Sequence, residues 1–236
     1  GYREKGYYPE AFINMLALLG WNPGTDQEIM SLAELTRLFD LDRVHKGGAK
    51  FDPEKTKWFN QQYLRMRPDT ELGEQLLERL NAKGVSTTLE RATHAAALLK
   101  ERATFVDDML EGTYLFVSGS PLRGNVSADE ELRKRWRPEL APALEAYIEL
   151  LSGLSSFGPQ DLDGAFSTVL QAQGLKVGQL MPVYRLFVAG RMQGPGMFDV
   201  SALLGKEEVV ARLRAGGFRL FDTQFLTAHL ASLGAV

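Results

Sequence analysis

The residues with the clearest potential for chemistry lie in one stretch near the C-terminal end of this 236-residue chain. Arg185 is the one cation of an apolar run, and a Gly194-Pro195-Gly196 turn follows a break at Gly190. Proline fixes φ and its flanking glycines permit positive φ, so such a turn exposes backbone N–H and C=O groups in a defined geometry. An arginine beside a rigid turn of this kind is suited to gripping one unpaired nucleotide. A plain connection between two helices gives the same pattern, so both interpretations stay open at this point.

The sequence argues against several other kinds of site. It has no cysteine, so neither a disulfide nor a thiolate metal site can form. Its three histidines, His45, His94 and His229, lack any paired spacing, which disfavours a histidine-based metal site. No apolar run approaches the roughly 20 residues of a membrane span, and there is no signal-peptide pattern. The chain begins at Gly1 rather than at methionine, from which we expect a piece of a longer protein.

The distribution of charge is more informative than its sum. The net charge of −3 argues mildly against a nucleic-acid partner, since such proteins are usually basic. Between residues 43 and 67, however, cations clearly outnumber the acids Asp52 and Glu54. This excess is suited to following a phosphate backbone, although a solvated helix face gives the same composition. The cations are Arg43, Lys46, Lys50, Lys55, Lys57, Arg65 and Arg67.

Helical signals recur along the chain, and no alternating pattern predicts a sheet. Pro9 suits the first turn of a helix and Gly20 its end. Ser31 with Glu34, and Thr87 with Glu90, have the spacing of capping boxes. Asp52 before Pro53 predicts another helix start. We therefore predict an all-α protein.

The middle of the chain is predicted to be less regular. Residues 111–116 are expected to form a short extended link, which a Gly/Ser/Pro-rich loop follows. Further helices are predicted from about Asp129, from Pro138 to Leu151 and from Asp161 to Gln173. Trp136 lies among basic residues that could frame a stacked base, but a core position is the more ordinary role of such a tryptophan.

Two groups of motifs resemble those of bacterial glutamyl-tRNA synthetases. Near the start, EAFINMLALLGWNPG, FDLDRV, GAKFD and KWFNQQYL resemble the segment that follows the KMSKR-type catalytic loop of that family. From Arg185 to Lys206, the pattern R-x4-G-x3-GPG-x8-GK resembles its C-terminal anticodon-binding domain. The resemblance runs in order from the start of the chain to about Lys206. It implies the end of a helical stem-contact domain over residues 1–68 and an α-helical anticodon-binding domain in two parts, 69–112 and 113–236.

The catalytic motifs of that family do not occur in the sequence. Its HIGH-type motif and KMSKR-type loop bind and activate ATP and glutamate, and both are missing here. Gly205 and Lys206 lack the other residues of a phosphate-binding loop. We therefore expect no catalytic residue, no cofactor and no activity in this chain alone. ATP and Mg²⁺ would act in the catalytic domain of a parent enzyme that attaches glutamate to tRNA.

The resemblance also implies which residues approach the anticodon. In the family, the helix end that corresponds to Lys100, Glu101 and Arg102 faces the anticodon, and the position of Arg102 is associated with its third base. Arginine there goes with reading of glutamate tRNA alone, and glutamine with relaxed reading. A simpler role for Arg102 is to stabilise a helix C-terminus, where cations are favoured by about 0.3–1 kcal/mol.

A second group of family positions falls on the glycine–proline turn and the helix before it. Met197 offers a polarizable apolar side chain to a base, although a place in the core is an equally open interpretation. Met192 is the least specific member, because other apolar residues occur at its position in the family. The positions are Arg185, Met192, Gly194, Pro195, Gly196 and Met197.

The function that follows is tRNA binding. We expect Arg43, Lys46, Lys50, Lys55 and Lys57 to contact the tRNA backbone. We expect a glutamate-specific tRNA as partner, neither DNA nor a membrane, a monomer, and a cytoplasmic location. One alternative is a helical protein-interaction module without RNA binding, and salt dependence discriminates between the two because phosphate binding weakens steeply with salt. A complete small enzyme is a further alternative, and the sequence offers no catalytic constellation for it.

Overall fold

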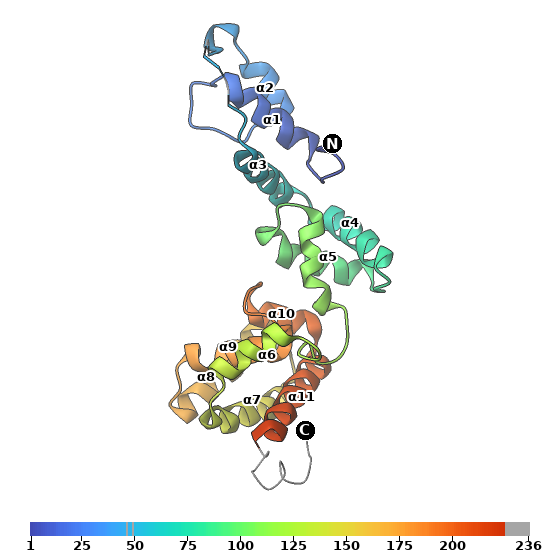
Figure 1. Cartoon of the computed structure of the whole chain (residues 1–236), viewed down its shortest axis with the longest axis vertical. Helices are drawn as coiled ribbons and strands as arrows, with labels where there is room; N and C mark the ends of the chain where they lie inside the picture. Colours follow the sequence, from blue (N-terminus) through green and yellow to red (C-terminus); the bar gives the residue numbers. More distant parts are fainter. Residues whose placement is uncertain (46, 49, 225–236) are drawn as a thin grey trace. The chain divides into compact units, whose positions relative to one another are not determined.

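The chain is helical throughout the part that a computed structural model describes, residues 1–224 except 46 and 49 (Figure 1). Within those residues no β-strand forms, and a single isolated antiparallel bridge joins Trp21 to Val44. The predicted all-α fold is confirmed. The chain divides into two compact units, one of residues 1–113 and one that begins at Tyr114. The predicted three-part division, with boundaries after residues 68 and 112, stays a prediction.

The first unit contains five α-helices in chain order, with short 3₁₀ helices after them (Figure 1). The α-helices are α1 (Pro9–Gly20), α2 (Leu32–Leu38), α3 (Pro53–Met66), α4 (Asp69–Ala82) and α5 (Leu89–Leu99). The 3₁₀ helices are η1 (Leu41–Arg43), η2 (Lys100–Arg102) and η3 (Val106–Leu115), and the boundary between the units falls within the last of them.

The predicted helix starts are confirmed with one exception. Pro9 begins α1, Ser31 and Glu34 form both hydrogen bonds of a capping box at α2, and Asp52 caps α3 through Glu54 N–H and Lys55 N–H. The expected capping box of Thr87 was wrong by one residue. Thr88 is the N-cap of α5, and its hydroxyl accepts a hydrogen bond from Arg91 N–H at 3.2 Å. Two neighbouring threonines offer the same chemistry, so spacing alone did not decide between them.

Helices α1 and α3 form the core of the first part of this unit. Phe59 and Tyr63 of α3 pack against Ala11 and Met15 of α1. The Tyr63 hydroxyl also lies within hydrogen-bonding distance of two oxygens that its one proton can bind, at 2.6 Å from Met30 O and 2.9 Å from an Asn14 side-chain oxygen. Because buried polar groups are costly unless they are paired, these bonds fix how α3 lies against α1.

Helices α4 and α5 approach each other closely. A Cβ atom placed on Gly73 would lie 2.7 Å from the Cα atom of Thr93 and 2.9 Å from its backbone nitrogen. Leu72 and Leu76 of α4, like Ala92 of α5, are fully buried. The small residues therefore set the distance between the two helices.

Up to residue 224, where the described part ends, the second unit contains six α-helices and one short 3₁₀ helix (Figure 1). They are α6 (Val126–Arg135), η4 (Pro138–Leu140), α7 (Ala141–Gly153), α8 (Pro159–Gln173), α9 (Val177–Ala189), α10 (Met197–Leu204) and α11 (Lys206–Gln224). The predicted helices near residues 129, 138 and 161 are confirmed, with starts that lie up to three residues from those expected.

The core of this unit is built on aromatic side chains. Tyr147 of α7 meets Phe166 of α8 and Tyr184 of α9 edge-on, with ring centroids 5.1 and 5.3 Å apart. The Tyr184 hydroxyl is hydrogen-bonded to Ser201 of α10, and the Tyr147 hydroxyl donates to Leu162 O at 3.3 Å. Burial raises the pKa of both tyrosines, so they stay neutral and act as packing and hydrogen-bonding groups. This core holds α9 and α10, which flank the glycine–proline turn.

The expectation of an extended link at residues 111–116 was wrong. Residues up to Leu115 continue the 3₁₀ helix η3, and no extended strand forms there. Gly112 allows this, because a Cβ atom on it would lie 2.6 Å from a methyl carbon of Leu99. A close helical approach, rather than an extended one, therefore explains this glycine.

Candidate nucleic-acid interface

The segment Lys100–Arg102 presents one exposed arginine beside two charged residues that form ion pairs within the first unit. Lys100 forms an ion pair with Asp69, at 2.7 Å between Nζ and Oδ1. Glu101 forms an ion pair with Arg65, whose guanidinium also donates to Glu101 O at 2.5 Å. Arg102 is exposed and has no hydrogen-bond or ion-pair partner among the residues that the structure describes. Of the three charges, Arg102 is thus the one available to a ligand.

The position of Arg102 is fixed from α3 rather than by its own contacts. Asn60 of α3 is fully buried, and its side-chain amide donates to Thr104 O at 2.6 Å. The oxygen of the same side chain accepts from Tyr8 N–H at 2.8 Å. Together with the bond from Arg65 to Glu101, these contacts hold the backbone on both sides of Arg102. An exposed side chain on a backbone held in this way is well placed to read a ligand.

The glycine–proline turn lies between α9 and α10 and is held by side chains of the same unit. Gly190 ends α9 in the left-handed conformation with φ of 65°, and Gly194 has φ of 149°. Arg185 of α9 donates a hydrogen bond from Nη2 to Pro195 O at 2.9 Å. Arg185 therefore supports the turn directly, and its half-buried guanidinium lies at the edge of the candidate site.

The predicted contact residues of the turn differ in their exposure. Gly196 is exposed, Gly194 and Met192 are half-buried, and Pro195 is buried. Met197 is only 3% exposed as the first residue of α10. This burial agrees with the core interpretation of Met197, and a contact between its side chain and a base stays a prediction. Its contribution to a site would be to support the backbone that other residues present.

Two residues at this turn carry no signal in the sequence pattern. The side chain of Asn125 donates to Gly190 O at 2.9 Å and to Pro121 O at 3.3 Å, which ties the end of α9 to the loop before α6. The Tyr114 hydroxyl lies 3.6 Å from the position that a Cβ atom on Gly194 would take. Neither residue belongs to a motif, and both are far from the turn in sequence, so spacing could not identify them.

The basic segment is less free for phosphates than its composition predicts. Arg43 donates to Pro23 O at 2.5 Å, and Lys55 and Lys57 form ion pairs with Glu28 and Glu54. Lys50 is exposed and has no ion pair within the described part of the chain. The two lysine pairs are close to half exposed, and such pairs contribute little, so a phosphate could replace the carboxylate. Lys46 lies outside the described residues.

Other kinds of site find little support in residues 1–224. Apart from residues 46 and 49, this range holds no group of three His, Cys, Asp or Glu side chains suited to a metal ion. His229, one of the three histidines of the sequence, lies outside it. None of the described helices is both long and apolar enough to cross a membrane. Trp136 is half-buried, with its ring 6.3 Å from that of Phe187, and both of the roles considered for it stay predictions.

Comparison with known families places both candidate regions within one domain type. Residues 69–216 match a family model described as an anticodon binding domain, and this range includes Arg102 and the whole turn from Gly190 to Met197. The chain belongs to this family. Residues 1–58 match a second model, described as the catalytic domain of class I tRNA synthetases for E and Q.

Individual relatives agree with these families. A glutamate–tRNA ligase from Flavobacterium johnsoniae is 42% identical over 214 residues, which covers 91% of this chain and 42% of the relative. One from Porphyromonas gingivalis is 42% identical over 215 residues, with coverage of 91% and 42%. A solved structure of a glutamate tRNA ligase from Elizabethkingia meningosepticum, in complex with its amino acid, matches with a TM-score of 0.82 at 37% identity. That match covers 92% of this chain and 42% of the solved one.

These matches confirm the resemblance that the motifs predicted. The chain spans less than half the length of the relatives that it matches. What those complete proteins do is therefore a property of a longer molecule, and this chain corresponds to one part of it.

Proposed function

We propose that this chain binds tRNA for glutamate, with the anticodon as the part that it distinguishes. The observation that carries the proposal is the match of residues 69–216 to the anticodon-binding family, over a range that contains an exposed arginine and a braced glycine–proline turn. Arginine, backbone groups and apolar surface are the means by which proteins grip unpaired bases.

The two candidate regions would contribute in different ways. Arg102 offers a planar, donor-only group that fits the O2 and N3 acceptors of cytosine. Gly194, Pro195 and Gly196 would bring backbone close to a base, with Arg185 holding the turn and adding positive charge. Met192 adds a half-buried apolar side chain on the same loop.

The basic segment would contact the tRNA backbone without reading sequence. Lys50 is the best placed of the predicted residues, because it is exposed and unpaired among the described residues. Lys55 and Lys57 would join it by exchanging a carboxylate for a phosphate. Arg43 is the weakest member, since its guanidinium is bonded to Pro23 O.

The wider role belongs to a longer parent protein. That parent would attach glutamate to tRNA with ATP and Mg²⁺ in a catalytic domain, as its relatives' name of glutamate–tRNA ligase suggests. A monomer in the cytoplasm is the form in which we expect it to act.

The test is binding of the chain to purified tRNA isoacceptors at two salt concentrations. We expect glutamate tRNA to bind more tightly than the others at both concentrations, and binding of every tRNA to weaken steeply as salt rises. Equal affinity for all isoacceptors would contradict anticodon recognition. Binding that does not respond to salt would contradict phosphate contact as well.

A matched pair of lysine variants tests the backbone contact. Lys50→Ala should weaken binding of all tRNAs about equally and reduce the slope of log affinity against log salt by about one. Lys83→Ala is the control, because Lys83 is an exposed lysine of the same unit outside the predicted backbone-binding set. An equal change in the two variants would mean that Lys50 contributes only the non-specific effect of a positive charge and makes no phosphate contact of its own.

A further inference from the structure

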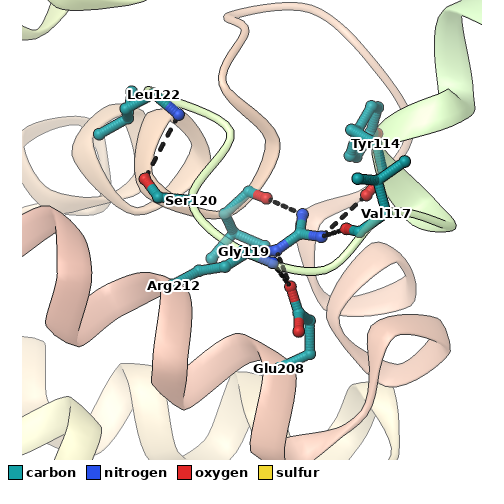
Figure 2. Close-up of polar contacts among 8 residues, drawn as sticks. Tyr114, Val117, Gly119, Ser120, Leu122, Glu208 and Arg212 are labelled. Atoms are coloured by element: carbon teal, nitrogen blue, oxygen red, sulfur yellow. Dashed lines mark hydrogen bonds and ion pairs between the residues drawn. The ribbon is translucent and has the colours of Figure 1, made fainter. Parts of the chain in front are cut away.

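A fully buried arginine organises the second unit at a distance from the sequence motifs. Arg212 of α11 is 1% exposed, and its guanidinium lies among backbone carbonyl oxygens (Figure 2). Nη1 donates to Val188 O at 2.6 Å, and Nη2 donates to Tyr114 O at 2.9 Å and to Val117 O at 2.6 Å. Nε donates to Glu208 at 2.7 Å, which completes the neutralisation of its charge.

These contacts join three separate segments. Val188 belongs to the last turn of α9, two residues before the glycine that ends that helix, while Tyr114 and Val117 belong to the segment that opens the unit. Glu208 extends the connection, because its Oε1 also accepts from Gly119 N–H at 2.9 Å (Figure 2). Removing the arginine would take the donor from one buried carbonyl oxygen, that of Val188, and from two part-buried ones, and an unpaired buried oxygen is costly.

The same network places the side chain of Tyr114 beside the turn. Its carbonyl oxygen faces Arg212, and its ring lies on the other side of the backbone (Figure 2). At the far end of the ring, the hydroxyl lies 3.6 Å from the Cβ position of Gly194, and Arg185 Nη1 lies 3.3 Å from that same position. Tyr114 and Arg185 therefore form adjacent walls of the space that Gly194 leaves open.

The Tyr114 hydroxyl lies beside the turn and does not hold it through a hydrogen bond. It is buried and has no hydrogen-bond partner among the residues that the structure describes. A buried hydroxyl without a partner adds no hydrogen bond, so Tyr114 supports the turn through the space that its side chain fills, and the hydroxyl is its atom nearest to Gly194.

We propose that Tyr114, anchored through its carbonyl by Arg212, is a positioning residue for the turn at residues 190–196. Its side chain, with the hydroxyl nearest to Gly194, limits the positions that Gly194 and Arg185 can take, and so keeps the turn in the shape that receives a base. This inference rests on the proposed function, since it explains how the turn is prepared for an anticodon. It also makes a statement about the free protein, because the turn should be held in place before RNA arrives.

The first experiment compares Tyr114→Ala with Tyr114→Phe by amide hydrogen exchange in the full chain without RNA. Tyr114→Ala should speed exchange across residues 190–196 by roughly tenfold or more, while the core of α8 exchanges as before. Tyr114→Phe keeps most of the side chain and loses only the atom nearest to Gly194, so exchange across the turn should be faster than in the unchanged protein and slower than in Tyr114→Ala. Equal protection of the turn in all three proteins would overturn the inference. If Tyr114→Ala fails to fold, Tyr114→Leu removes the ring while keeping apolar bulk, and the same comparison applies.

The second experiment measures base-dependent binding. The probes are a glutamate anticodon stem-loop and the same RNA with its first two anticodon positions abasic. The ratio of their Kd values should fall by roughly tenfold in Tyr114→Ala, about the effect of losing one good base contact, and fall by less in Tyr114→Phe. Arg212→Lys should behave like Tyr114→Ala, because one ammonium cannot serve carbonyls on two segments and Glu208 in the same geometry.

The outcomes separate the two proposals. A ratio near one in the unchanged protein would mean that the turn does not read bases, so the proposed function would fail at this site. A large ratio that Tyr114→Ala leaves intact would mean that the turn reads bases without help from Tyr114. A general loss of stability would lower binding of both RNAs alike and leave their ratio unchanged, which would also count against a positioning role.

Discussion

At the scale of single residues, the environment decides which charge is available for recognition. Lys100, Glu101 and Arg102 are consecutive, yet the first two are held in ion pairs with Asp69 and Arg65. The sequence alone could not separate them, because Asp69 lies 31 residues before Lys100 and Arg65 lies 36 residues before Glu101. The resemblance singled out Arg102, and the structure supplies a physical reason why that residue can meet a ligand.

The turn gives a prediction that separates backbone strain from loss of contact. Gly194 has φ of 149°, so Gly194→Ala should destabilise the protein by about 1–3 kcal/mol as well as weaken RNA binding. Gly196 has an ordinary φ of −53°, and an added Cβ atom would meet only the flexible end of Asp199. Gly196→Ala should therefore change the free energy of unfolding little.

Binding and thermal unfolding of the two glycine variants should be measured side by side. If backbone at the exposed Gly196 lies against a base, Gly196→Ala weakens binding of the anticodon stem-loop without a matching loss of stability. Undiminished binding by Gly196→Ala would show that the backbone at that residue does not approach a base closely.

At the scale of elements, local chemistry predicted helix starts better than it predicted connections. Capping at Ser31 and Asp52 depends on neighbours within four residues, and both were predicted correctly. The continuation of the 3₁₀ helix over residues 111–115 was missed, since close contact between Gly112 and Leu99 favours it and no local pattern reports such a contact. The network of Arg212 was equally hidden, because its partners Val117 and Tyr114 lie 95 and 98 residues away.

The close approach of α4 and α5 gives a prediction at this scale. Gly73→Ala should lower the free energy of unfolding by about 1–3 kcal/mol, because its Cβ atom would lie within 3 Å of the backbone of Thr93. Gly20→Ala in α1 is the control, since nothing lies within 4 Å of the added atom, and its effect should stay within about 0.5 kcal/mol. Urea denaturation of the two variants gives the comparison. A Gly73→Ala protein as stable as the control would show that the two helices can separate without cost.

At the scale of the whole molecule, recognition and catalysis are expected to be separable. The sequence contains neither of the two motifs that bind and activate ATP and glutamate in the related synthetases. The chain alone should therefore show no glutamate-dependent exchange between ATP and pyrophosphate, with or without tRNA. The control is a full-length glutamate–tRNA ligase assayed in parallel. Exchange by a pure preparation of this chain would contradict the assignment of its parts.

The central claim is that Arg102 reads the third base of the anticodon. Cytosine, which ends glutamate anticodons, offers acceptors on its pairing edge, whereas guanine, which ends a glutamine anticodon, offers N1–H and N2–H donors. A permanently charged, donor-only arginine favours the first, and a good bidentate pair is worth about 1–3 kcal/mol. Glutamine carries both an acceptor and donors, so Arg102→Gln should accept either base.

The most direct measurement is the pair of Kd values for anticodon stem-loops that differ only in that base. The unchanged protein should prefer the C-ending loop by the roughly 5- to 150-fold that 1–3 kcal/mol represents, and Arg102→Gln should bring the two Kd values to within about tenfold while the fold stays intact. Arg37→Gln is the control, because it removes an exposed arginine of the same unit from the last turn of α2 and should leave the preference unchanged. A preference that survives in Arg102→Gln would contradict the account and move the reader to another residue, with Arg185 the next to test.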